Sequence, residues 1–93
     1  GGFYENIPRM LSEGVHARIE KDSYPVPPVF GLLAEKGGIE EQVMYNTYNM
    51  GIGMIAAVDA ADADRTVKAL KEAGETPYVV GPIVSGEKGV TLC

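Results

Sequence analysis

The sequence predicts an α+β domain in which helices pack on a small mixed β-sheet. Three observations support this fold class. Residues 15–21 alternate apolar and polar side chains, which is typical of a half-buried strand. Residues 53–80 have the pattern of a strand, an amphipathic helix and a second strand, and therefore predict a β-α-β unit. With 93 residues, 45% of them hydrophobic and 23% charged, the chain is predicted to form one small domain.

Local signals place the elements of the first half of the chain. Pro8 fits a helix only in the first turn, where its missing N–H is not needed. Pro28 suits a helix start, and the Gly37–Gly38 pair suits a helix end. We therefore expect a helix at residues 6–11, a strand at 15–21, a stiff proline-rich connection at 22–28, and two further helices at 28–36 and 40–47.

The second half is expected to supply the rest of the sheet. Ala63, Val67 and Leu70 recur at helical spacing, and Gly74 ends that helix. After it the chain resumes apolar runs, separated by a turn with the sequence SGEKG. The expected elements are a buried strand at residues 53–59, a helix at 61–73, a third strand at 77–80 and a terminal hairpin at 83–92.

Charge and composition narrow the possible partners. The formal net charge is −5 and the eight basic residues are scattered, which argues against binding to nucleic acid. The longest apolar run, residues 50–58, contains two glycines and ends at Asp59, so no membrane-spanning segment is expected. A single cysteine, Cys93, and a start that does not resemble a signal peptide suit a cytoplasmic protein.

The stretch GGFYENIPRM at residues 1–10 is the first candidate binding site. Gly1 and Gly2 leave the backbone bare, so amide N–H groups at the start of a helix can approach a phosphate or carboxylate closely. Arg9 could add a charged contact. From the spacing alone, an ordinary tight turn is the more common explanation of two glycines before a helix, and Gly1 is also consistent with a cloning remnant.

The stretch YNTYNMGIGM at residues 45–54 is the second candidate. Asn49 is a poor helix former, and Gly51 and Gly53 alternate with apolar residues. This pattern indicates close packing on the glycine side, and the neighbour is a helix, another backbone segment or a ligand. The sequence shows no cluster of metal ligands, no nucleophile elbow and no phosphate-loop lysine motif. His16 lies on the polar side of its predicted strand and is interpreted as a surface histidine.

These two stretches, followed by an alanine-rich helix and a GXXXXGEKGV sequence at residues 81–90, carry a family resemblance. The chain resembles the C-terminal part of the C-terminal domain of phosphoribosylformylglycinamidine cyclo-ligases, the aminoimidazole ribonucleotide synthetases of purine biosynthesis. The resemblance covers essentially all of the chain. Two long motifs in the same order make it specific, whereas either glycine cluster alone would be ordinary.

The resemblance implies a function for a longer parent enzyme. Members of this family convert formylglycinamidine ribonucleotide and ATP to aminoimidazole ribonucleotide, ADP and phosphate, with Mg²⁺. The ATP-binding and metal-binding residues lie largely in an N-terminal domain that this chain lacks, so the chain alone is expected to be inactive and to hold no cofactor. The family also implies a homodimer, and an incomplete sheet would leave an edge open to pairing with a second copy.

The resemblance also places candidate site residues. Gly1, Gly2, Phe3 and Asn6 are expected to form a substrate-side loop that holds the 5′-phosphate of the ribonucleotide, together with Arg9. A glycine strand with Asn49, Gly51 and Gly53 is expected to pack closely or line the pocket, and the catalytic acid and base are not assigned. Asn6 could instead cap its own helix. The alternative function is a stand-alone ferredoxin-like module for small-molecule binding or dimerisation, because fold alone does not settle function.

Overall fold

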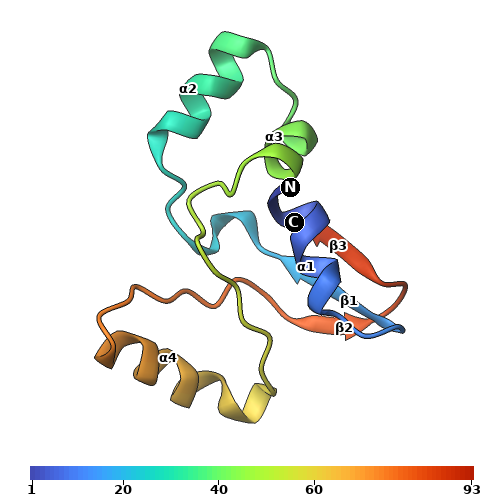
Figure 1. Cartoon of the computed structure of the whole chain (residues 1–93), viewed down its shortest axis with the longest axis vertical. Helices are drawn as coiled ribbons and strands as arrows, with labels where there is room; N and C mark the ends of the chain where they lie inside the picture. Colours follow the sequence, from blue (N-terminus) through green and yellow to red (C-terminus); the bar gives the residue numbers. More distant parts are fainter.

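The computed structural model describes residues 1–93 and contains helices and one three-stranded sheet (Figure 1). The α+β class with a small mixed sheet is thereby confirmed. None of the helices has both the length and the apolar character that a bilayer span requires. In chain order the elements are α1 (Gly2–Met10), β1 (Val15–Ile19), η1 (Lys21–Ser23), α2 (Pro28–Gly37), α3 (Glu41–Thr47), η2 (Ala60–Asp62), α4 (Ala63–Glu72), β2 (Ile83–Ser85) and β3 (Gly89–Leu92).

Strand β1 occupies the centre of the sheet, antiparallel to β2 and parallel to β3. The predicted terminal hairpin is therefore wrong, because β2 and β3 flank β1 and do not pair with each other. The connection between them passes the start of β1, where the Gly86 N–H donates to the Gly14 carbonyl at 3.1 Å. The physical reason is burial: Ala17 and Ile19 of β1 are 1% and 4% exposed, and a central position covers them best.

Helix α1 packs one face against the sheet and α3. Phe3, Ile7 and Leu11 recur every four residues, so all three lie on the same side and are buried. The helix begins earlier than predicted, and Pro8 lies in its last turn and not its first. Burying Phe3 and Ile7 contributes roughly 1.5–3 kcal/mol each, which offsets a proline penalty of about 3 kcal/mol. The predicted first-turn position of Pro8 was therefore wrong.

The remaining helices agree with the local signals. Helix α2 begins at Pro28, and Gly38 ends it in the left-handed conformation with φ 59°. Helix α3 follows after a short turn. The connection after β1 includes the short turn η1, so the strand ends at Ile19 and not at Lys21.

The predicted β-α-β unit does not form. Its helix is present as η2 and α4, but residues 53–59 and 77–80 belong to no strand. A strand requires a hydrogen-bonded neighbour, and no backbone group of residues 53–58 takes part in a hydrogen bond within the chain. Val80 does accept a hydrogen bond from the Glu20 N–H at 2.7 Å, but Pro82, two residues later, has no N–H to continue a ladder.

Every fully buried side chain lies within residues 3–50, on α1, β1, α3, the connections between them and the turn after α3. Residues 51–93 add only half-buried side chains to the edge of this core. Of residues 53–59 only Ile55 is half-buried and the others are exposed, so the predicted burial of this segment is also wrong in this chain. Figure 1 shows α4 lying apart from the sheet at the end of two extended segments. The buried residues are Phe3, Ile7, Leu11, Ala17, Ile19, Tyr24, Met44, Tyr45 and Met50.

Candidate functional site

A surface hollow of about 390 Å³ lies between the start of α1 and the segment that follows α3. The two candidate stretches, far apart in the sequence, both contribute to its lining. Six of the lining residues are hydrophobic, and the polar side chains are two asparagines. The lining residues are Gly1, Gly2, Phe3, Asn6, Ile7, Met10, Asn49, Ile52, Gly53, Met54 and Ile55.

The N-terminus of α1 offers backbone donors at this hollow. The helix begins at Gly2 and has no side-chain cap. The N–H groups of Gly2, Phe3 and Tyr4 donate to no backbone acceptor outside the helix, and the first amides of a helix have no hydrogen-bond acceptor within it. These three amides, with the positive end of the helix dipole, could hold an anionic group.

The glycine at position 2 is required by packing. Its φ is 62°, a left-handed conformation that side chains rarely adopt. A Cβ atom on Gly2 would collide with the carbonyl oxygen of Tyr45 and would lie 2.9 Å from that of Tyr48. The start of α1 therefore sits directly against the C-terminal carbonyls of α3, and this contact holds one wall of the hollow in place.

Asn6 does not cap its own helix. Its side-chain Nδ2 donates to the Gly2 carbonyl at 2.9 Å, whereas a cap would accept from a backbone N–H. The alternative role as a helix cap was therefore wrong. The Asn6 Oδ1 accepts a hydrogen bond from Arg9 Nη1 at 3.4 Å. Arg9 itself is exposed and does not line the hollow.

The second stretch divides into packing and lining residues. The Asn49 Oδ1 accepts from the Gly51 N–H at 2.8 Å, which fixes a tight turn. Gly51 has φ 96°, and a Cβ on it would lie 2.9 Å from Cγ of Pro27, so Gly51 packs on the proline-rich connection and not on the hollow. A Cβ on Gly53 would meet nothing within 4 Å, and Gly53 faces the open hollow.

A buried tyrosine, Tyr24, is hydrogen-bonded to the same turn at residues 49–51. The Tyr24 hydroxyl donates to the Met50 carbonyl at 3.0 Å. Burial raises the pKa of Tyr24 to about 12, and the neighbouring Tyr45 adds to the increase. Burial also raises the pKa of Tyr45. Both phenols are therefore neutral near pH 7 and act as fixed packing and hydrogen-bonding groups.

His16 serves the sheet and lies outside the hollow. Its Nδ1 lies 2.7 Å from the Glu87 carbonyl oxygen, and its Nε2 lies 2.6 Å from Thr91 Oγ1. Because a carbonyl only accepts, the neutral ring carries its proton on Nδ1 and accepts from the Thr91 hydroxyl at Nε2. The ring thus ties the β2–β3 connection to β1. No carboxylate is within hydrogen-bonding distance of it.

The family model described as "AIR synthase related protein, C-terminal domain" matches residues 1–93. The chain belongs to this family. It is 67% identical over 92 residues to a phosphoribosylformylglycinamidine cyclo-ligase of Agathobacter rectalis, covering 99% of this chain and 27% of that protein.

Further relatives carry the same name. The enzyme of Lachnospira eligens is 68% identical over 93 residues, and that of Lachnoclostridium phytofermentans is 67% identical over 93 residues. Each alignment covers 100% of this chain and 27% of the relative. The chain therefore spans about a quarter of the length of the curated relatives it matches.

Sequence reasoning missed the apolar side of the hollow. Ile7 and Met10 lie four and seven positions after Phe3, a spacing that places all three on one face of a helix. Once Phe3 is assigned to a site on a helix, this periodicity identifies the other two. The contribution of Ile52 and Ile55 depends on how the chain after α3 returns to α1, and no local pattern shows it.

Proposed function

We propose that this chain is the C-terminal part of a phosphoribosylformylglycinamidine cyclo-ligase. The complete enzyme would convert formylglycinamidine ribonucleotide and ATP to aminoimidazole ribonucleotide, ADP and phosphate in purine biosynthesis. Family membership over residues 1–93 and relatives of that name at 67–68% identity support the proposal. A cytoplasmic homodimer, implied by the same resemblance, is part of it.

The hollow is proposed to hold the phosphate end of the ribonucleotide. The supporting observation is that two distant stretches meet around one hollow, at which the first three amides of α1 lack acceptors. The Asn6 and Asn49 side chains line the same hollow and are proposed to contact the sugar hydroxyls. Apolar residues such as Phe3 and Ile52 would pack against the less polar part of the substrate.

ATP and Mg²⁺ are proposed to bind mainly elsewhere in the complete enzyme. Magnesium prefers carboxylate oxygens and phosphate ligands, whereas no group of three His, Cys, Asp or Glu side chains in this chain is placed to hold a metal ion. The polar lining of the hollow consists of backbone and amide groups, which do not form a magnesium site. The donor set therefore fits the anionic end of a substrate and does not fit the metal.

Steady-state kinetics of the complete enzyme with Gly53→Val tests the assignment of the hollow. A Cβ at Gly53 meets nothing within 4 Å and its φ is not in the left-handed region, so the new side chain should fold normally and fill the hollow. We expect the KM for the ribonucleotide to rise by about tenfold, equivalent to one lost contact of roughly 1.4 kcal/mol, with the KM for ATP unchanged.

Gly31→Val is the matched control. Gly31 also has open space at its Cβ position and an ordinary φ, but it lies in α2 and does not line the hollow. Both KM values should stay unchanged in this variant. An unchanged ribonucleotide KM in Gly53→Val, with the protein folded, would contradict the proposed binding site.

A further inference from the structure

The turn at residues 49–51 has an unusual backbone conformation beside the hollow. The Ile52 N–H closes the turn by donating to the Asn49 carbonyl at 3.0 Å. Between them, Met50 and Gly51 have φ of 53° and 96°, and positive φ at both central residues is the pattern of a type I′ turn. Met50 is the only residue other than glycine with a positive φ. A side chain persists in this conformation only where its surroundings fix it.

Contacts with the core fix the turn. The Met50 side chain is 5% exposed, and its carbonyl accepts a hydrogen bond from the Tyr24 hydroxyl at 3.0 Å. On the other side of Asn49, the Tyr48 N–H donates to the Met44 carbonyl at 2.9 Å, which joins the turn to the end of α3. The backbone of Asn49 is therefore held from both directions.

The Asn49 side chain is fixed as well. The Gly51 N–H can only donate, so the Asn49 atom that lies 2.8 Å from it is the carboxamide oxygen Oδ1. No other hydrogen bond joins this side chain to the protein. Asn49 lines the hollow, and its nitrogen Nδ2, with two N–H groups, is the polar atom left for a ligand.

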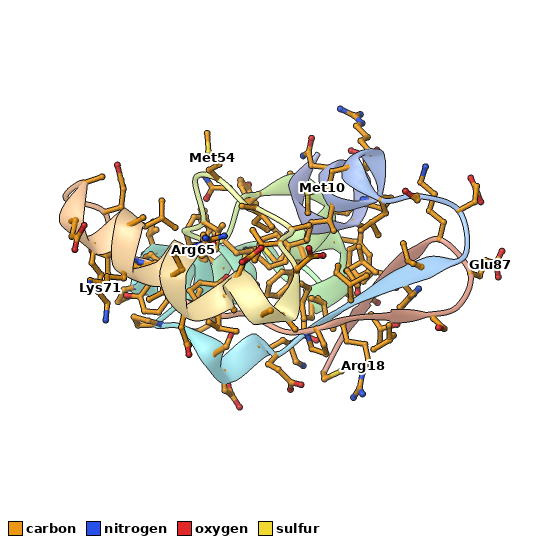
Figure 2. All side chains as sticks on the ribbon, turned by 90° about the horizontal axis from the view of Figure 1, so that it is seen from below. Met10, Arg18, Met54, Arg65, Lys71 and Glu87 are labelled. Atoms are coloured by element: carbon orange, nitrogen blue, oxygen red, sulfur yellow. The ribbon has the colours of Figure 1, made fainter.

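Asn6, the other asparagine of the hollow, is arranged differently. Its Nδ2 donates to the Gly2 carbonyl, and its Oδ1 accepts from Arg9. Both polar atoms of Asn6 therefore already have partners in the protein. The rest of the side-chain lining is apolar and includes Met10 and Met54, which lie on the same side of the molecule in Figure 2. Asn49 is thus the one lining side chain whose amide nitrogen is entirely unused.

We propose that Asn49 Nδ2 donates a hydrogen bond to an oxygen of the ribose 2′,3′-diol and thereby makes the hollow select a ribonucleotide over its deoxy analogues. This inference rests on the proposed function, in which the hollow takes the phosphate end of the ribonucleotide. With the phosphate at the first amides of α1, the diol of the same sugar falls within one hollow of about 390 Å³. Small-molecule sites measure roughly 300–1,000 Å³.

The rigid turn is what makes this donor selective. Because the core already holds the turn, Asn49 loses little conformational freedom when a ligand binds. A deoxy analogue would leave the Asn49 N–H without an acceptor in the bound state. Sites built to hydrogen-bond a substrate hydroxyl reject analogues that lack it.

The ratio of kcat/KM values of the complete enzyme for the ribonucleotide and for its 2′-deoxy and 3′-deoxy analogues tests the proposal. The wild type should use at least one analogue about tenfold or more less efficiently. In Asn49→Ser the hydroxyl can still accept from the Gly51 N–H and keep the turn, but it is too short to replace the amide donor. The ratio should fall to about twofold or less in this variant.

Asn46→Ser is the matched control, because Asn46 is exposed on α3 and does not line the hollow. It should keep the ratio of the wild type. A wild type that uses both analogues as well as the ribonucleotide would overturn the proposal without any variant, and so would a full ratio in folded Asn49→Ser. Turnover of the ribonucleotide itself tests the proposed function, whereas only the ratio tests Asn49, so the two failures are distinguishable.

Discussion

Replacing Gly2 with alanine tests the contact that joins α1 to α3 beside the hollow. The new Cβ would collide with the Tyr45 carbonyl oxygen and would press on that of Tyr48 at 2.9 Å. Both obstacles are backbone atoms, so neither can rotate away. The left-handed φ of 62° adds about 1–2 kcal/mol, and overpacking adds roughly 1–3 kcal/mol. We therefore expect Gly2→Ala to lower the free energy of unfolding by about 2–5 kcal/mol.

Gly14→Ala separates the two contributions. Gly14 has φ 85°, but a Cβ there would meet nothing within 4 Å. This variant should lose only the conformational part, about 1–2 kcal/mol. Urea unfolding followed by far-ultraviolet circular dichroism measures the stability of both variants. A difference of about 1–3 kcal/mol between them in the free energy of unfolding shifts the urea midpoint by about 1 M. Equal midpoints for the two variants would refute the close approach of α1 to α3.

Two further stability predictions use the same denaturation assay. Ile7 is 3% exposed and Met10 is 42% exposed on the same helix, so Ile7→Ala should cost about 2–5 kcal/mol and Met10→Ala much less; similar losses would contradict the burial of Ile7. Tyr24→Phe leaves the Met50 carbonyl without its donor and should cost about 1–3 kcal/mol. Since the pKa of Tyr24 rises from 10.0 to about 12 on folding, its contribution is complete below pH 10 and is lost as the pH rises through 12. Tyrosinate absorbance should show this delayed ionisation in the wild type, and its absence would argue against the buried phenol.

The sequence predicted the two stretches of the candidate site from their residue types. It did not predict which of their residues would meet at one hollow. Bare glycines before a helix and alternating glycines after another helix are local features, so both stretches could be named from the sequence. The structure brings Gly2, Asn6, Asn49 and Gly53 to one hollow. Gly51 belongs instead to the packing on Pro27, a neighbour that no short-range pattern could identify.

The errors in the sheet have a common physical origin. An apolar run shows that a segment is suited to a strand, but strand formation depends on a partner at a distant position. For residues 83–92 the partner was β1, inserted between the two runs expected to pair with each other. For residues 53–59 no strand partner is present within the chain, and the segment stays extended and exposed except for the half-buried Ile55.

The sequence by itself determined the α+β class, helices α2, α3 and α4, and the family to which the chain belongs. These follow from caps, periodicity and motifs, which depend on residues close together along the chain. Only the tertiary structure decided the strand order, the early start of α1 at Gly2 and the meeting of the two glycine stretches at one hollow. Those features depend on burial and backbone pairing between residues far apart in the chain, for which no local pattern carries the information.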